Sequence, residues 1–278
     1  MLFTSQLFAQ PLRLHIGGGF ANYNGDLQAS AFTLKQAHGL VSAGATFNIT
    51  NKIVLRSDYS FTKLGADDKF RNDIGIRRRN LNFGTLIREL TLMGEYHLFD
   101  LSERTWTPYV FAGIGVFKFS PYTTDSLNRK VFLQGLGTEG QGLPAFPDRK
   151  PYKKTQLNIP LGGGLKYALS DDVHLSVEMS MRKLFTDYLD DVSTTYVDEN
   201  VLLAARGQTA VDFAFRGDEL KTDPQTYPAA GAQRGGSKHK DLYYFGQVKI
   251  SFRMNWFDNG GLNNGSRKSR LGCPTKVL

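Results

Sequence analysis

At 278 residues and 31.0 kDa, the chain is long enough for one large or two small domains, and its contents of glycine (29 residues) and aromatic residues (12%) exceed those of an average soluble domain. A mean hydropathy of -0.32 and the lack of any 18-residue apolar run exclude a membrane-spanning helix, but not a membrane barrel, whose strands are half polar. The net charge of +8 is spread along the chain, which favours solvated loop charge or attraction to anionic lipid over a nucleic-acid partner.

The first residues, MLFTSQLFAQ, are similar to the end of a secretory signal, with a short apolar stretch and the small residue Ala9 before Gln10, although a basic segment ahead of it is lacking. We expect residues 1–9 to be the remnant of a signal peptide, and therefore an exported protein; an ordinary frayed terminus is the alternative. The single cysteine, Cys273, excludes an internal disulfide framework and leaves the redox compartment open.

Apolar and polar residues alternate with a period of two in eight segments, each at least 9 to 11 residues long, which is the length that a tilted strand needs to cross a bilayer. The predicted strands are residues 12–22, 37–50, 52–64, 81–99, 107–120, 155–169, 173–185 and 241–256.

The spacers between these segments alternate in length. Short ones lie at Asn51 and its neighbours, at residues 100–106 and at 170–172; long ones span residues 23–36, 65–80, 121–154 and 186–240. Outer-membrane barrels combine short periplasmic turns with long outer loops in this way. The sequence therefore predicts an eight-stranded antiparallel up-and-down transmembrane β-barrel over residues 10–257, with short periplasmic turns, long extracellular loops and both termini in the periplasm. Residues 258–278 are expected to form a basic, disordered periplasmic tail.

The polar face of each strand is expected to be the barrel interior, because a Lys or Arg that faces lipid at mid-depth costs about 2 to 4 kcal/mol. In residues 173–182, Val177 and Met179 alternate with Glu178 and Ser180, so the valine and methionine should meet lipid. The short turns bring Arg56 level with Glu95, and Glu178 level with Arg253 or Lys249. We expect these pairs to fill the lumen, since eight strands enclose only enough space for side chains.

Aromatic residues near strand ends are expected to form girdles at the two membrane interfaces. The candidates are Tyr59, Phe61, Tyr96, Tyr109, Phe119, Tyr167, Trp256 and Phe257.

The sequence gives little support to catalysis, metal binding or a cofactor. The glycine clusters at residues 17–20 and 161–165 match no phosphate-binding pattern, and the histidines have no evident serine and acid partners. The carboxylates of residues 187–200 are an alternative calcium site, but they lack regular loop spacing. We expect a non-enzymatic protein without a cofactor, metal, nucleic-acid partner or small-molecule substrate.

Two stretches resemble the outer-membrane barrel of the type IX secretion system, the PorG-like family: GTEGQG at residues 137–142 and RKLFTDYLDDVSTTY at residues 182–196. Weaker likenesses lie in GGGFANYNGDL (17–27), TPYVFAGIGVFKFSP (107–121) and IPLGGGLKYALS (159–170). The resemblance makes the two loop motifs candidates for interaction or loop ordering, at Gly137, Thr138, Glu139, Gly140, Gln141, Gly142, Asp187, Tyr188, Asp190 and Asp191.

The resemblance implies a barrel subunit of a protein-secretion machine of gliding bacteria and their relatives. Its partners would be outer-membrane lipid, a periplasmic ring lipoprotein and the ring partner of that lipoprotein, and it would anchor or organise the ring without being the translocon channel. The expected contacts with the ring are the periplasmic turn residues Asn51, Lys52, Asp171 and Asp172. The alternatives are a surface adhesin or ligand-binding barrel that acts through its long extracellular loops, and an outer-membrane enzyme.

Overall fold

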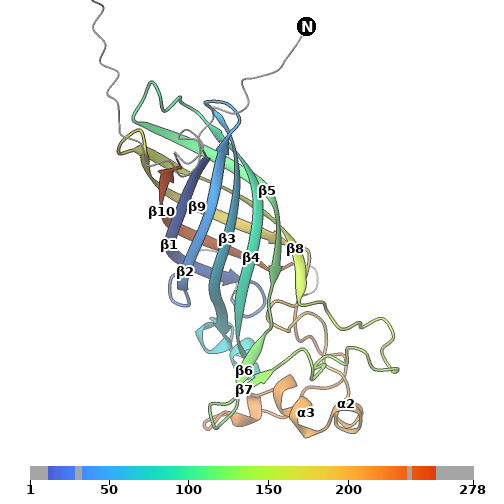
Figure 1. Ribbon diagram of the computed structural model, residues 1–278. Coiled ribbons are helices and arrows are strands. Elements are labelled where there is room, and N and C mark those ends of the chain that lie inside the picture. Colours follow the sequence, from blue (N-terminus) through green and yellow to red (C-terminus); the bar gives the residue numbers. More distant parts are fainter. Residues whose placement is uncertain (1–11, 29–32, 237–239, 255–278) are drawn as a thin grey trace, which may run out of the picture.

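The computed structural model describes residues 12–28, 33–236 and 240–254. Eight long strands form the body of the molecule (Figure 1). They are β1 (Leu12–Asn24), β2 (His38–Asn48), β3 (Ile53–Asp67), β4 (Asn82–His97), β5 (Trp106–Lys118), β8 (Thr155–Ala168), β9 (Val173–Leu184) and β10 (Leu242–Arg253).

The strands form one closed antiparallel sheet. The order runs β3-β2-β1-β10-β9-β8-β5-β4, and the pairing of β3 with β4 completes the ring. A closed ring leaves no unpaired edge along the barrel wall, as a structure surrounded by lipid requires. The predicted eight-stranded barrel is confirmed, and its predicted strand ends lie within three residues of the observed ones.

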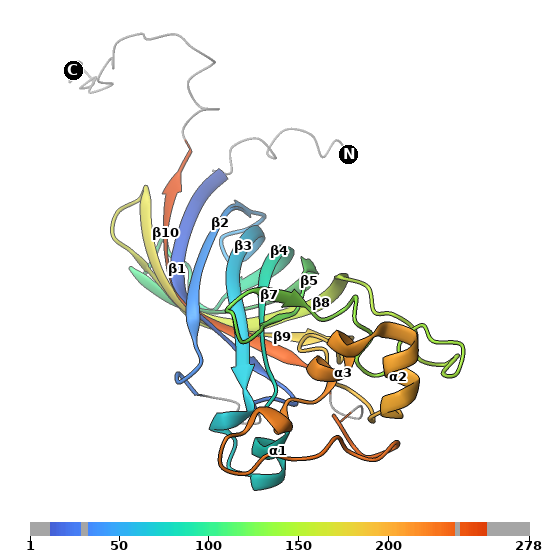
Figure 2. The same cartoon turned by 90° about the horizontal axis from the view of Figure 1, so that it is seen from below.

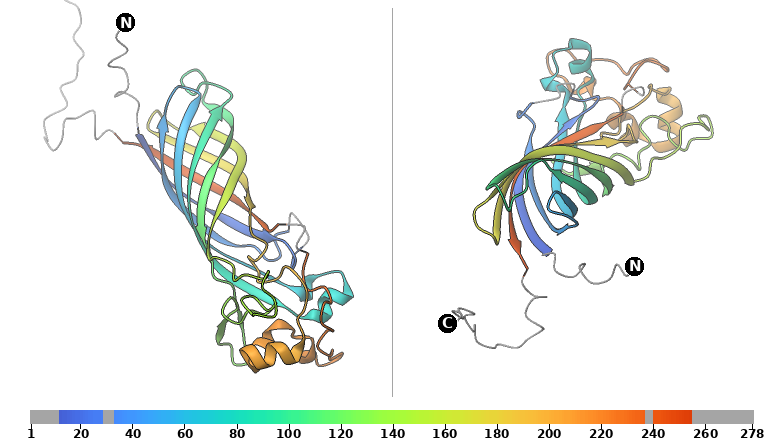
Figure 3. Two further views of the ribbon diagram at one scale, coloured as in Figure 1. Left: turned by 90° about the vertical axis from the view of Figure 1, so that its right-hand side faces the viewer. Right: turned by 90° about the horizontal axis from the view of Figure 1, so that it is seen from above.

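The two ends of the barrel differ, as Figures 1 and 3 show. One end carries the short turns at residues 49–52, 98–105 and 169–172, and β1 begins and β10 ends at this end, where Leu14 is opposite Phe252. We call it the turn end. The other, the loop end, carries the four long connections at residues 25–37, 68–81, 119–154 and 185–241, whose described parts we call the cap.

The cap contains most of the remaining secondary structure. A hairpin of β6 (Tyr122–Thr124) and β7 (Lys130–Phe132) extends the edge of β4, and helices α1 (Ile74–Arg79), α2 (Glu199–Arg206) and α3 (Gln208–Ala214) lie over the loop end (Figure 2). Short 3-10 helices span Asp68–Phe70 and Gly217–Glu219. Within the described residues, no helix is long and apolar enough to cross a membrane.

The outer wall of the barrel is apolar. In β9, Val177 and Met179 are 53% and 49% exposed, whereas Glu178 is 1% exposed and faces the lumen. The same alternation exposes large apolar side chains around the ring: Leu14, Ile16, Val41, Leu55, Leu90, Leu92, Val110, Ile114, Leu161, Leu165, Val248 and Phe252. So many exposed apolar side chains in one continuous band need a hydrocarbon surrounding, because a water-soluble surface does not carry an apolar patch of this extent.

The outward-facing aromatic residues of the wall differ in exposure. Tyr59, Phe61, Tyr96 and Tyr167 are exposed as expected. Tyr244 occupies an outward position but is buried, because the backbone N–H of Thr33 in the cap donates a hydrogen bond to its hydroxyl.

The prediction of the aromatic girdles was wrong for two residues, since Tyr109 and Phe119 are each 1% exposed. Tyr109 faces the lumen, where its hydroxyl donates to Glu178 at 2.8 Å, and Phe119 packs among aromatic rings at the loop end. Trp256, Phe257, the expected signal remnant, Cys273 and the tail at 258–278 lie outside the described residues.

The lumen has two layers. Nearer the turn end, ion pairs join three cations, Arg56, Lys166 and Lys249, to three carboxylates, Asp58, Glu95 and Glu178. At the loop end, the lumen is filled mainly by apolar and aromatic side chains that include Leu40, Leu64, Ile87, Phe117 and Phe245. The ion pair of Arg182 with Glu89 lies at the border of this second layer, because Glu89 is opposite Phe117 and the Arg182 guanidinium lies 3.7 Å from the centre of the Phe245 ring. The expectation of a lumen packed with charges throughout was therefore wrong for the loop-end layer, where inward positions pack against the cap instead of water.

Candidate functional sites at the two ends of the barrel

The expected pair of Arg56 and Glu95 is present, with Arg56 Nη1 2.6 Å from Glu95 Oε1. The register places Arg56 opposite Met93, so the contact with Glu95 is diagonal. The same Nη1 lies 2.8 Å from Glu178 Oε2. Arg56 therefore joins carboxylates from opposite sides of the barrel and holds the interior together.

Glu178 also pairs with Lys249, at 3.0 Å, which was one of its two expected partners. The other expectation was wrong: Arg253 lies at the rim of the turn end, where its Nε is 3.6 Å from Asp172 Oδ1. Arg253 lies six residues beyond Gln247, which is opposite Glu178, so its side chain cannot reach the level of Glu178, since each residue advances a strand by about 3.3 Å.

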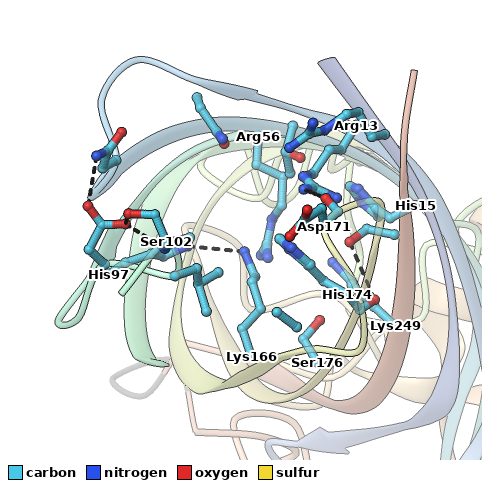
Figure 4. A pocket seen from close by; sticks show the side chains of 18 residues that line it. Arg13, His15, Arg56, His97, Ser102, Lys166, Asp171, His174, Ser176 and Lys249 are labelled. Carbon is cyan, nitrogen blue, oxygen red and sulfur yellow. Dashed lines mark hydrogen bonds between the residues drawn. The ribbon is translucent and has the colours of Figure 1, made fainter. Parts of the chain in front are cut away.

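A cavity of about 290 Å³ opens at the turn end, on the turn-end side of the charged layer, and we call it the vestibule. Its lining includes Arg13, His15, His97, Lys166, His174 and Arg253. In Figure 4, Arg13, Arg56, Lys166 and His174 point from different strands into the interior of the ring. The rim of this mouth carries charges of both signs, because Asp100, Asp171 and Asp172 lie there with Arg13 and Arg253.

Arg13 is the least compensated of these cations. It is 6% exposed, and its Nη2 and Nη1 donate to the backbone oxygens of Asp171 and Asp172 at 2.6 and 3.1 Å. Its buried Nε has no hydrogen-bond partner among the residues that the structure describes. A buried guanidinium is normally stabilised by a carboxylate or phosphate with charge-assisted hydrogen bonds. Arg13 therefore relies on the backbone oxygens and the nearby carboxylates of Asp171 and Asp172, and it holds the turn between β8 and β9 at the rim of the vestibule.

The expected contact residues at the turns surround this mouth. Asn51 and Lys52 are exposed, and Asn51 Nδ2 donates to Asp100 Oδ2 at 2.7 Å, which links two turns. Asp171 and Asp172 are also exposed and hold Arg13 through their backbone oxygens. Sequence reasoning placed these turns correctly but missed the vestibule, because Arg13 and His174 are far apart in the chain and meet only when the sheet closes.

The loop end carries a second organised region, built by the GTEGQG motif. Gly137, Gly140 and Gly142 have φ values of 58°, 77° and 75°, a left-handed backbone that favours glycine. A Cβ atom at Gly140 would lie 2.8 Å from Phe146 and 2.9 Å from Val197. The turn directs Glu139 into the cap, while Gln141 Oε1 accepts a hydrogen bond from the backbone N–H of Glu139 at 3.0 Å.

Glu139 is fully buried and joins two long loops. Its Oε1 lies 3.0 Å from Arg234 Nη1, and its two oxygens accept hydrogen bonds from the backbone N–H groups of Ser193 and Thr194. Tyr188 also donates its hydroxyl to Glu139 Oε2 at 3.2 Å. This pattern satisfies both carboxylate oxygens, as a buried charge requires.

The other motif carboxylates complete the network. Thr138 Oγ1 and the hydroxyl of Tyr152 each donate to Asp191 at 2.6 Å, and Ser193 Oγ donates to Asp187 Oδ2 at 2.8 Å. Burial raises the pKa of Asp187 and that of Asp191 to about 6 each, although these hydrogen bonds oppose the shift.

The remaining two long loops join through arginine and aspartate. Arg79 in α1 pairs with Asp68 at 2.8 Å and donates to the backbone oxygen of Arg234. Asp26 of the first loop accepts hydrogen bonds from the backbone N–H of Gly236. All four long loops are thus tied to one another, which agrees with a loop-ordering role for the motif residues.

Asp190 and Asp241 share a proton with Tyr23. The Tyr23 hydroxyl lies 2.6 Å from Asp190 Oδ2 and 2.7 Å from Asp241 Oδ1. A phenol has one hydrogen and can donate to only one of them, so the second contact requires a protonated carboxyl that donates to the phenol oxygen. The pKa values of both aspartates are raised well above the usual range, by burial first and, for Asp190, also by the charge of Asp241.

Several comparisons bear on this architecture. The model of a domain of unknown function, DUF6089, matches residues 1–132, and no curated protein matches the sequence. A solved structure of Neisserial surface protein A is 8% identical with a TM-score of 0.43, and the match covers 87% of this chain and 97% of that one. Ail of Yersinia pestis is 9% identical with a TM-score of 0.42, and the match covers 88% of this chain and 99% of Ail. A major outer membrane protein of Thermus thermophilus is 13% identical with a TM-score of 0.42, and the match covers 88% of this chain and 100% of that protein.

At these identities and scores, the assignment rests on the strand pairing and the outer wall of this chain itself. A closed ring of eight antiparallel strands, apolar outside and charged within, defines a transmembrane β-barrel protein.

Proposed function

We propose that this protein is a non-enzymatic barrel subunit of a type IX protein secretion system in the outer membrane, and that it anchors or organises the periplasmic lipoprotein ring. The sequence resemblance in GTEGQG and in residues 182–196 supports this assignment. The long loops would face the cell exterior and the turn end would face the periplasm, which is the usual arrangement of outer-membrane barrels.

The observation that carries the proposal is the contrast between a filled lumen and an accessible turn end. The charged and apolar layers fill the barrel, so the protein is unsuited to be a conduit for exported chains. The vestibule and the exposed residues Asn51, Lys52, Asp171 and Asp172 offer a surface to a periplasmic partner. A polar segment of the ring lipoprotein or of its ring partner, with charges of both signs, fits this rim, where Arg13 and Arg253 lie beside Asp171 and Asp172.

The test is a pull-down of the tagged barrel from detergent-solubilised membranes of its own host, with identification of the proteins that co-purify. We expect the ring lipoprotein to be recovered with the wild-type barrel and to be lost when Lys52→Glu and Asp171→Lys are combined. The matched control is Lys130→Glu with Asp218→Lys, which makes the same charge changes in the cap and should keep the ring. Unchanged recovery with the turn-end variant excludes contact through the turns, and absence of the ring from the wild-type sample excludes the secretion role.

A surface adhesin or ligand-binding barrel is the second candidate, and one feature of the cap favours it. A cavity of about 540 Å³ there is lined by Arg78, Tyr196, Phe215 and Gln225, among others. Within the described part of the cap, the buried hydroxyl of Tyr196 has no hydrogen-bond partner. Arg78→Glu with Gln225→Ala tests this function. Loss of binding to cells or glycans while secretion continues supports the adhesin, and unchanged binding excludes this cavity as its site.

A further inference from the structure

Three basic side chains lie next to one another on the outer wall of the barrel, toward its loop end: Lys63 on β3, Arg88 on β4 and Lys118 on β5. Arg88 is directly opposite Lys118 in the pairing of β4 with β5. Phe61 is opposite Arg88 in the pairing of β3 with β4, so Lys63 is its diagonal neighbour. All three side chains are exposed, and we call them the basic wall patch.

The patch is not explained by the stability of the barrel. Within the described part of the chain, none of its three members has a carboxylate oxygen within 4.0 Å, and the nearby Asp67 pairs with Lys69 at 2.8 Å. Like charges opposite each other on neighbouring strands destabilise a sheet, because their Cβ atoms are only about 5 Å apart. Three adjacent cations on a rigid wall therefore require an anionic partner from outside the chain.

The position of the patch identifies this partner. Toward the turn end, each of the three strands continues with exposed apolar side chains on the same face: Tyr59 and Phe61 on β3, Leu90 and Leu92 on β4, and Ile114 and Val116 on β5. The three cations are the first charges beyond this apolar band. In a membrane, this is the level at which hydrocarbon gives way to lipid headgroups, where Lys and Arg meet phosphate.

We propose that the basic wall patch binds the phosphate groups of a membrane lipid that lies against β3, β4 and β5. Arg88 supplies a planar guanidinium that can hold two phosphate oxygens, and the two lysines supply ammonium groups on either side of it. The acyl chains of the same lipid lie along the exposed apolar side chains on the turn-end side of the patch. This site depends on the barrel spanning a membrane and not on its role in secretion, so either proposal can fail without the other.

The test compares the wild-type protein with the triple variant K63Q/R88Q/K118Q after purification and reconstitution. Each is placed in vesicles of phosphatidylcholine alone, or of phosphatidylcholine with a minor fraction of phosphatidic acid. The unfolding temperature is read from the heat-dependent change in gel mobility. We expect phosphatidic acid to raise the unfolding temperature of the wild-type barrel and to leave that of the triple variant unchanged. In phosphatidylcholine alone, the triple variant should be at least as stable as the wild type, because its like-charge repulsion is gone.

The matched control is R77Q/K150Q/K221Q, which removes one arginine and two lysines that are exposed in the cap. It should respond to phosphatidic acid like the wild type, and native mass spectrometry should find fewer retained phosphatidic acid molecules on the wall variant than on this control. An equal response of the wall variant and the wild type would overturn the proposal, and so would loss of the response in the control. An equal rise caused by inorganic phosphate in phosphatidylcholine vesicles would show that the ligand is the free ion, and would overturn the assignment to a lipid.

Discussion

The two layers of the lumen differ in how they keep the same barrel closed. The turn-end layer buries three cations, Arg56, Lys166 and Lys249, against three carboxylates, and Arg56 alone contacts Asp58, Glu95 and Glu178. The loop-end layer buries Leu64, Phe117 and their neighbours against the cap. Removing one partner from a buried ion-pair network leaves its other charges without a partner and strongly destabilises the fold. Removing an apolar side chain from a packed layer costs stability in proportion to the size of the group removed. The comparison therefore predicts large, cooperative losses at the turn end and local, separable losses at the loop end.

The largest loss is expected for Arg56→Met. Three carboxylates would remain without their shared cation, and breaking a buried pair in this way costs about 3 to 5 kcal/mol. The free energy of unfolding in vesicles, followed by tryptophan fluorescence in urea, measures it. Adding Glu178→Gln removes one of the stranded charges and should restore part of the loss; a double variant that is no more stable than Arg56→Met would contradict the compensation account.

The next effect is expected for Glu139→Gln in the cap. Arg234 would lose its closer carboxylate and keep only Asp191, whose Oδ2 is 4.0 Å from Arg234 Nη2. We expect a cost of about 3 kcal/mol, which corresponds to cleavage about 10²-fold faster in residues 185–241 under limited proteolysis. The barrel itself should keep its heat-dependent gel mobility. Simultaneous melting of the cap and the barrel would show that the two regions are not separable.

A smaller effect is expected from pH, again confined to the cap. The pKa values of Asp187 and Asp191 are raised by burial from 3.8 to about 6, so the folded cap binds protons more tightly than the unfolded chain. Their contribution to cap stability is fully present below about pH 4 and is lost as the pH rises through about 6. Asp190 and Asp241, whose pKa values are raised further, extend this loss to higher pH.

Protease resistance of the cap, corrected for the pH dependence of the protease, should therefore fall as the pH rises from about 4 through about 6, and should fall further at higher pH because of Asp190 and Asp241. Asp190→Asn keeps a neutral donor beside Tyr23 and should reduce the fall. A cap that becomes more resistant with rising pH would contradict the shared proton.

The smallest effect is expected for Arg253→Gln at the rim. Its Nε is 3.6 Å from Asp172 Oδ1 and both side chains are partly exposed, so the pair contributes less than about 1 kcal/mol. Urea unfolding should barely distinguish this variant from the wild type. A loss comparable to that of Arg56→Met would place Arg253 in the compensated layer after all.

The barrel was predictable from the sequence because its signal is local. Alternation with a period of two places Val177 outside and Glu178 inside whatever the rest of the chain does, and turn length fixes which strands are neighbours. The apolar layer around Phe117 and Phe119 was not predictable in this way. Whether an inward residue packs against protein or faces water depends on the cap, whose position the strand pattern does not give.

The sites followed the same division. The turn residues Asn51 and Asp171 were placed correctly, because a short spacer between two antiparallel strands must form a turn at the end of the barrel. The contact of Glu139 with Arg234 joins residues 95 positions apart, and the vestibule is also lined by residues from distant strands. No local sequence pattern predicts either of these sites. Gly137 and Gly140 were singled out only through the resemblance of GTEGQG, and their left-handed backbone is a reason for glycine at these positions.

The central claim is that one face of every strand meets lipid and the other meets the charged lumen. Single cysteines at Ser176, Val177, Glu178 and Met179, in a background with Cys273→Ser, would each be spin-labelled in reconstituted vesicles, and the accessibility of each label to lipid-soluble oxygen measured. The account predicts high accessibility at 177 and 179 and low accessibility at 176 and 178. Equal accessibility at all four positions, or the reverse alternation, would contradict the membrane barrel.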